Sequence, residues 1–132
     1  AVDLSGTTYA TNNFFNGAAN VDFGIATTDS STAAIIELAS GTTTLATQTV
    51  AGFRALYGVG GGSAISTGAN DDFSGIIIAY NGTGTSANAA VFYVDTSTNT
   101  GTAETIHGSD TVELIAILEG VGADTLTAAN FF

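Results

Sequence analysis

The chain has 132 residues, a formal net charge of −11 and no Cys, Met, Pro or Trp. This length allows one domain with a modest core, and the charge excludes a nucleic-acid partner, which needs clustered Lys and Arg. The absence of Cys excludes disulfides and thiolate-ligated metals, and the apolar runs are too short to insert into a membrane.

The composition predicts a folded chain that is rich in strands. Ala, Gly and Thr fill 61 of the 132 positions, the hydrophobic fraction is 45%, and the mean hydropathy is +0.36. Such a chain has enough apolar surface to form a core, which argues against disorder despite the high net charge. Thr, Val, Ile and aromatic residues favour strands over helices.

In chain order, the first predicted element is an extended arm. We expect it to span residues 1–15, and residues 2–9 within it could add a strand to the sheet of a neighbouring copy. Runs of strand-forming residues separated by Gly, Asn, Ser and Asp predict strands over 21–27, 33–39, 43–50, 73–80, 90–95 and 111–119. The segment 51–57 fits either a helical turn or an irregular strand. We therefore predict an all-β single domain over 1–132, an antiparallel β-sandwich of jelly-roll or Ig-like type.

Two of the predicted strands are apolar on both faces. Residues 76–78 are three consecutive Ile, and residues 91–94 read Val-Phe-Tyr-Val. Such strands need cover on both sides. Either a neighbouring subunit covers the second face, or a loop of the same chain does.

One segment has the oxygen-rich spacing of a calcium loop. Asp95, Ser97 and Asn99 alternate along the chain, with Glu104 beyond them. The glycine comes one place late at Gly101, and no Glu stands at the twelfth position. Two interpretations stay open, a calcium site and a solvated turn between strands.

Further carboxylates lie near other predicted strand ends. Asp71 and Asp72 precede one strand, and Asp110 and Glu113 lie at the start of another. They are either a second set of calcium ligands or a polar rim that keeps the surface soluble. Because like-charged carboxylates repel one another, a bound divalent ion would relieve that repulsion.

Catalysis has little support in the residues. His107 and Asp110 could join a serine on paper, but there is no Gly-x-Ser-x-Gly motif and no Trp to bind a sugar. We expect no enzyme activity. The single cation, Arg54, should be paired, and Asn81 begins an Asn-Gly-Thr triplet that would accept a glycan.

The C-terminal part carries a family resemblance. Residues 72–80 and 91–95 form two strand-like runs, followed by Asp-Thr-Val-Glu-Leu-Ile-Ala-Ile-Leu-Glu-Gly-Val at 110–121 and Asp-Thr-Leu-Thr-Ala-Ala-Asn-Phe-Phe at 124–132. This succession resembles the C-terminal module of bacterial RTX-type proteins exported by type I secretion. The resemblance implies an extracellular protein with an uncleaved C-terminal export signal. The glycine-rich calcium-binding nonapeptides of that family do not occur in the sequence.

These observations lead to one functional expectation and two alternatives. We expect a structural subunit that polymerises into an extracellular bacterial filament, surface layer or biofilm matrix. A monomeric calcium-dependent adhesin or carbohydrate-binding module is one alternative, and the C-terminal secretion domain of a larger hydrolase is the other. The lack of Met leads us to expect a processed form or a fragment, and Ala1-Val2-Asp3 would also suit cleavage after general secretion.

Overall fold

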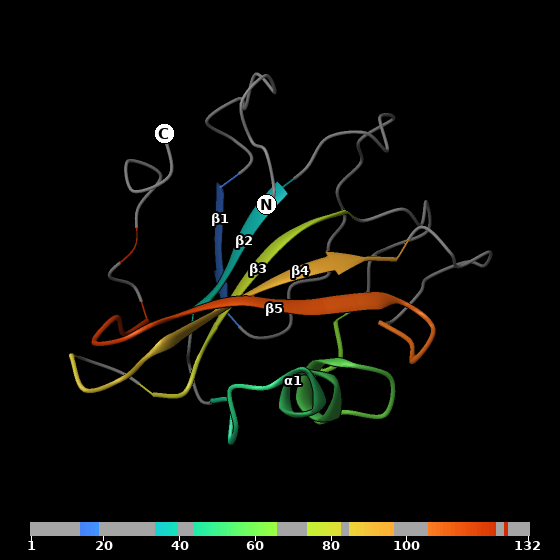
Figure 1. The fold of residues 1–132 in the computed structure, drawn as a ribbon, viewed down its shortest axis with the longest axis horizontal. Helices are drawn as coiled ribbons and strands as arrows, with labels where there is room; N and C mark the ends of the chain where they lie inside the picture. The colour runs from blue at the N-terminus through green and yellow to red at the C-terminus, as the bar shows by residue number, and fades with distance from the viewer. Residues whose placement is uncertain are drawn as a thin grey trace.

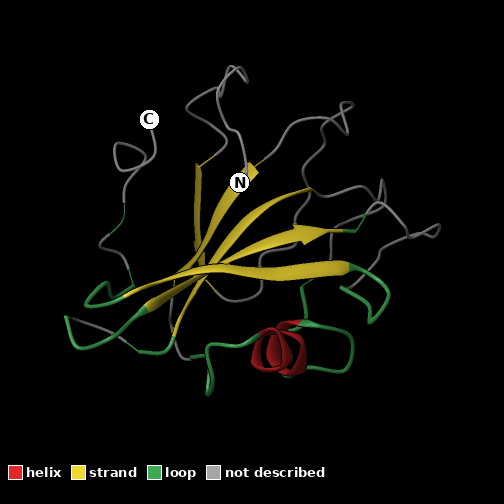
Figure 2. Cartoon of the chain, in the orientation of Figure 1, coloured by secondary structure: helices red, strands yellow, loops and turns green. Residues whose placement is uncertain are grey.

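The structure is a computed structural model that describes residues 14–18, 34–39, 44–65, 74–82, 85–96, 106–123 and 126. Five strands of this part form one sheet, in which they lie side by side in chain order (Figure 1). The strands are β1 (Phe14–Ala18), β2 (Ala34–Ala39), β3 (Ser74–Tyr80), β4 (Ala89–Asp95) and β5 (Thr111–Leu118). One helix, α1 (Val50–Tyr57), lies against one face of the sheet (Figure 2). The described part of the chain is therefore mostly β, as its composition predicts.

Each end of β2, β3, β4 and β5 lies within one residue of the end expected from sequence. The strand expected over 43–50 is wrong, because residues 46–49 bend and α1 begins at Val50. β1 was not expected, since Asn16 and Gly17 within it are a typical turn pair. The strand expected over 21–27 lies outside the described residues.

The sheet is mixed. Pairing is antiparallel from β3 through β4 to β5 and parallel from β1 through β2 to β3. Parallel neighbours need a long crossover, and α1 lies in the connection from β2 to β3. The expected antiparallel pairing thus holds for the C-terminal three strands only. The described strands form a single sheet, so the sandwich stays a prediction.

Helix α1 resolves the open choice for residues 51–57. Thr49 caps its N-terminus, where the side-chain oxygen accepts a 3.0 Å hydrogen bond from the backbone nitrogen of Gly52. Phe53 and Tyr57, four positions apart, are buried on the same side of the helix. Burial of these two rings against the sheet explains why a short, Gly-containing segment is helical.

Both faces of the sheet carry a core. The helix-side core consists of Leu38, Leu45, Phe53, Tyr57, Ile65, Ile77, Ala79, Ala90, Phe92, Val94, Ile106 and Val112. The opposite-side core consists of Ile76, Ile78, Tyr80 and Ala89, with Val91, Tyr93, Leu118, Val121, Ala123 and Leu126 partly buried against them. Residues of the same chain thus cover both faces of β3. Of the two explanations for its apolar sequence, cover from within the chain is the right one, and β3 needs no neighbouring subunit.

Close packing between α1 and the segment that precedes it gives a prediction for Gly52. A Cβ atom at this position would lie 2.3 Å from the carbonyl oxygen of Thr47. Although Ala favours helices over Gly by about 1 kcal/mol, we expect Gly52→Ala to lower the free energy of unfolding by about 1–3 kcal/mol through this overlap. Urea unfolding measures the change. Gly62→Ala is the control, because a Cβ there meets nothing within 4 Å; equal stabilities of the two variants would contradict the prediction.

Candidate functional site

The predicted calcium loop begins at the end of β4. Asp95 is half-buried, and its Oδ2 accepts a 3.3 Å hydrogen bond from the hydroxyl of Tyr93, which lies 2.9 Å from the Ser74 hydroxyl. The other predicted ligands, Ser97, Asn99, Glu104, Asp71 and Asp72, lie outside the described residues. Among residues that the structure does describe, no three His, Asp or Glu side chains are grouped to hold a metal ion. Calcium binding therefore stays a prediction.

The strand register relates the two predicted acidic segments to each other. Ser74 at the start of β3 pairs with Asp95 at the end of β4. The chain therefore enters β3, just after residues 71–72, at the same end of the sheet where it leaves β4 toward residues 97–99. Sequence reasoning treated the two segments separately, but their described neighbours lie side by side.

Arg54 links α1 to the turn before β5. Its Nη1 donates to the carbonyl oxygen of His107, and its Nη2 donates to the carbonyl oxygen of Asp110 at 2.5 Å. The Asp110 carboxylate in turn accepts a 2.6 Å hydrogen bond from the backbone nitrogen of His107. The expectation that Arg54 is paired is confirmed, and its partners in these two bonds are backbone carbonyls.

These contacts give His107 and Asp110 a structural part in the turn. The His107 side chain is exposed, whereas Asp110 is buried, and the hydrogen bonds that join them run through the backbone of His107. The Asp110 carboxylate therefore orders this turn through the backbone N–H of His107. The absence of enzyme activity stays a prediction.

The glycan candidate lies in the turn between β3 and β4. Asn81 is exposed, and its side-chain oxygen accepts a 2.8 Å hydrogen bond from the backbone nitrogen of Asn88. The side-chain amide thus already holds the turn. Glycosylation at this position stays a prediction.

Tyr57 gives the structure a pH dependence. Burial raises the pKa of its hydroxyl to about 12. Folding therefore favours the neutral hydroxyl of Tyr57. The contribution of this hydroxyl to the free energy of unfolding is complete below pH 10 and is lost as the pH rises through 12. The loss reaches at most about 3 kcal/mol.

Urea unfolding at pH 8 and pH 11.5 tests this dependence. We expect the parent to lose more stability between these pH values than Tyr57→Phe does. Tyr93→Phe controls for removal of a hydroxyl group elsewhere, and it should retain the loss seen in the parent. Identical losses in the parent and Tyr57→Phe would contradict the prediction.

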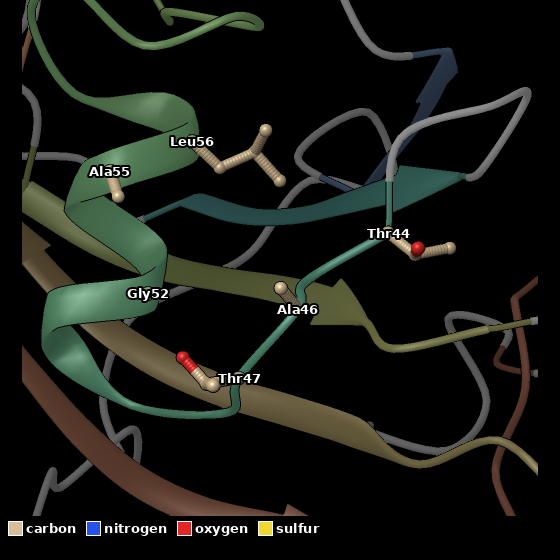
Figure 3. Close-up of a pocket in the computed structure, with 6 residues that line it drawn as sticks. All are labelled: Thr44, Ala46, Thr47, Gly52, Ala55 and Leu56. Carbon is tan, nitrogen blue, oxygen red and sulfur yellow. The ribbon is translucent and has the colours of Figure 1, made fainter.

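An open hollow of about 260 Å³ lies between α1 and the segment that precedes it (Figure 3). Its lining residues are uncharged: Thr44, Ala46, Thr47, Gly52, Ala55 and Leu56. Among the residues that the structure describes, the lining supplies Thr hydroxyls and no acid, base or cation. This described lining offers no charged group for catalysis or for binding a charged ligand.

The outer strand of the described sheet, β5, exposes aliphatic side chains. Leu114, Ile115 and Ile117 are 36%, 46% and 44% exposed. Phe92 of β4 pairs with Leu114, whereas its neighbour Val91 pairs with Ala116. Ile115 is therefore the extra residue of a β-bulge. Sequence reasoning identified this strand but not its position at an edge or its exposed side chains. The available signal was in the sequence of β5, where the alternation of polar and apolar residues stops after Glu113.

Comparison of the chain with models of protein families, with curated proteins and with solved structures finds no match. In addition, no helix of the described residues is long and apolar enough to cross a membrane.

Proposed function

We propose that the chain is a structural subunit of an extracellular bacterial filament or surface layer, and that copies assemble through contacts between β-strands. The aliphatic edge strand β5 carries this proposal. An edge strand has unpaired backbone groups along its outer side, and exposed aliphatic side chains make pairing with another chain favourable. Most soluble proteins prevent such pairing.

The usual protection of a sheet edge is sparse in this chain. The sequence has no Lys and no Pro, which are common at protected edges, and its only Arg is bonded to the turn before β5. The bulge at Ile115 and the carboxylate of Glu113 are the protective features that β5 itself carries. These features limit pairing along β5 without covering its aliphatic side chains.

The net charge of −11 sets the conditions for assembly. Copies of the chain repel one another at low ionic strength, and salt screens that repulsion. Calcium ions bound to the predicted ligands at 71–72 and 95–104 would reduce it further. We therefore expect assembly to increase with salt and with calcium.

The β-sandwich and the RTX-like export signal belong to the same proposal. Apolar residues on both faces of the sheet support a fold with layers on both sides. The sequence of residues 110–121 and 124–132 supports export by type I secretion. The secreted location follows from that resemblance.

Negative-stain microscopy and light scattering of the native protein test the proposal. We expect regular polymers, and an increase in particle mass between low and physiological salt. Calcium and a chelator are compared at constant ionic strength to separate a bound ion from screening. A protein that stays monomeric at high concentration in salt and calcium would contradict the proposal and favour the monomeric adhesin.

A further inference from the structure

We propose that Asn81 is a site of self-modification in the folded protein, where attack by the backbone nitrogen of Gly82 converts its side chain to aspartate and isoaspartate. This inference is independent of the proposed assembly. The sequence has two Asn-Gly pairs, Asn16-Gly17 and Asn81-Gly82. Because glycine has no Cβ atom, its nitrogen approaches a neighbouring group more closely than that of any other residue. These two pairs are therefore the most reactive asparagines of the chain.

The reaction balances without an oxidant or a cofactor. The nitrogen of Gly82 bonds to Cγ of Asn81, the bond between Cγ and Nδ2 breaks, and the proton of the Gly82 N–H leaves with Nδ2 as ammonia. The product is a cyclic imide. Water then opens the ring at one of its two carbonyl carbons, which gives aspartate from one opening and isoaspartate from the other. Both products carry a carboxylate where the chain had a neutral amide.

The turn after β3 leaves the attacking nitrogen available. Asn81 is exposed, Gly82 is half-buried, and both lie beyond the last residue of β3. Within the described part of the chain, the nitrogen of Gly82 donates to no backbone oxygen. Ring closure at Gly82 therefore breaks no backbone hydrogen bond between this nitrogen and the described sheet.

A neighbouring donor favours the attack on Asn81. The backbone nitrogen of Asn88 donates a 2.8 Å hydrogen bond to the side-chain oxygen of Asn81. Negative charge develops on this oxygen when a nucleophile adds to Cγ, and a donor that is already in place stabilises such charge. The hydrogen bond that orders the turn thus also polarises the amide that reacts.

The other Asn-Gly pair is a natural control in the same chain. An aromatic residue precedes both asparagines, so their local sequences are similar. Asn16 and Gly17 lie inside β1, however, and both pair with residues of β2. Ring closure turns the peptide bond after the asparagine out of its extended conformation, which would disrupt this pairing. We therefore expect Asn16 to convert more slowly than Asn81 in the folded protein.

Conversion alters a turn that connects three parts of the molecule. The carbonyl oxygen of Asn88 accepts 3.2 Å hydrogen bonds from the backbone of Asn81 and from the side chain of Gln48, and its side-chain oxygen accepts a 3.0 Å bond from Gly120. Isoaspartate lengthens the main chain beside this residue. Conversion also consumes the amide that a glycan would need, so the two modifications exclude each other at Asn81.

Peptide mass spectrometry of the native protein tests the proposal. The protein is incubated at pH 8, folded or in urea, and then digested with pepsin in acid, where ring closure is slow. Mass separates the amide from the carboxyl products, and chromatography separates isoaspartate from aspartate. We expect both products at Asn81, formed at least about fivefold faster than at Asn16 in the folded protein. In urea the two rates should become similar, because the local structure is lost.

Gly82→Ala tests the identity of the attacking nitrogen. A Cβ atom at this position would lie 3.5 Å from that of Ala87, an ordinary contact, so the variant should fold. The added methyl group hinders ring closure, and we expect conversion of Asn81 to slow at least about fivefold while that of Asn16 is unchanged. Gly62→Ala is the matched control, because a Cβ there meets nothing within 4 Å, and it should leave both rates unchanged.

Three results would overturn the inference. Equal rates at Asn16 and Asn81 in the folded protein would show that the turn has no effect, and conversion of Asn81 in urea alone would show that the fold prevents the reaction. Aspartate without isoaspartate would mean that water attacks the amide directly, with no ring. Should Gly82→Ala fail to fold, the comparison of folded and unfolded parent still decides. None of these results bears on assembly, which is measured separately by particle mass.

Discussion

Replacing Phe53 with Ala should lower the free energy of unfolding by about 3–5 kcal/mol. Phe53 is fully buried between α1 and the sheet, with its ring centroid 4.5 Å from that of Phe92 and 5.2 Å from that of Tyr57. The substitution removes both ring contacts and leaves a cavity that α1 cannot fill without leaving the sheet. A small domain has only about 5–15 kcal/mol of stability, so this loss is a large part of it.

Urea unfolding followed by circular dichroism measures this effect. Val59→Ala, which truncates an exposed side chain, is the matched control and should change stability by less than about 0.5 kcal/mol. If Phe53→Ala unfolds fully, Phe53→Leu retains most of the apolar volume and should recover a folded protein. Equal stability of Phe53→Ala and the parent would show that α1 does not pack on β4.

Replacing Arg54 with Met should lower the free energy of unfolding by about 3 kcal/mol, because two charge-assisted hydrogen bonds are lost. Met keeps much of the apolar stem but cannot donate to the carbonyl oxygens of His107 and Asp110. The turn before β5 loses its link to α1. We therefore expect amide exchange to accelerate at the backbone nitrogen of Asp110, which donates to the carbonyl oxygen of His107.

Arg54→Lys separates charge from geometry in this prediction. Lys keeps the positive charge, but its ammonium group cannot extend two parallel donors as a guanidinium does. We expect Arg54→Lys to recover less than half of the stability lost in Arg54→Met. Full recovery would mean that charge alone acts at this position, and the two directed hydrogen bonds would then not matter.

Local sequence predicted most of the strands but not their order in the sheet. β3, β4 and β5 are rich in β-branched and aromatic residues, and turns separate them. Their boundaries were accordingly within one residue. The parallel pairing of β2 with β3 depends on α1, and the burial of Phe53 and Tyr57 that stabilises α1 is a tertiary effect. The strand predicted over 43–50 failed for the same reason.

The candidate site was predictable only in part. That Arg54 needs a partner follows from composition, since it is one cation among many acids. Its actual partners are carbonyl oxygens, which every residue carries, so no side-chain pattern could have identified them. The exposed aliphatic row on β5 depends on that strand being outermost and on the bulge at Ile115, and neither can be read from a single strand.

The mixed pairing of the sheet affects the order in which its strands form during folding. β3, β4 and β5 follow one another along the chain, so they can form by local pairing, whereas β1 and β2 must wait for the long crossover through α1. We therefore expect the three-stranded meander to appear first during folding. A newly synthesised molecule would thus present the exposed aliphatic side chains of β5 before β1 and β2 complete the sheet.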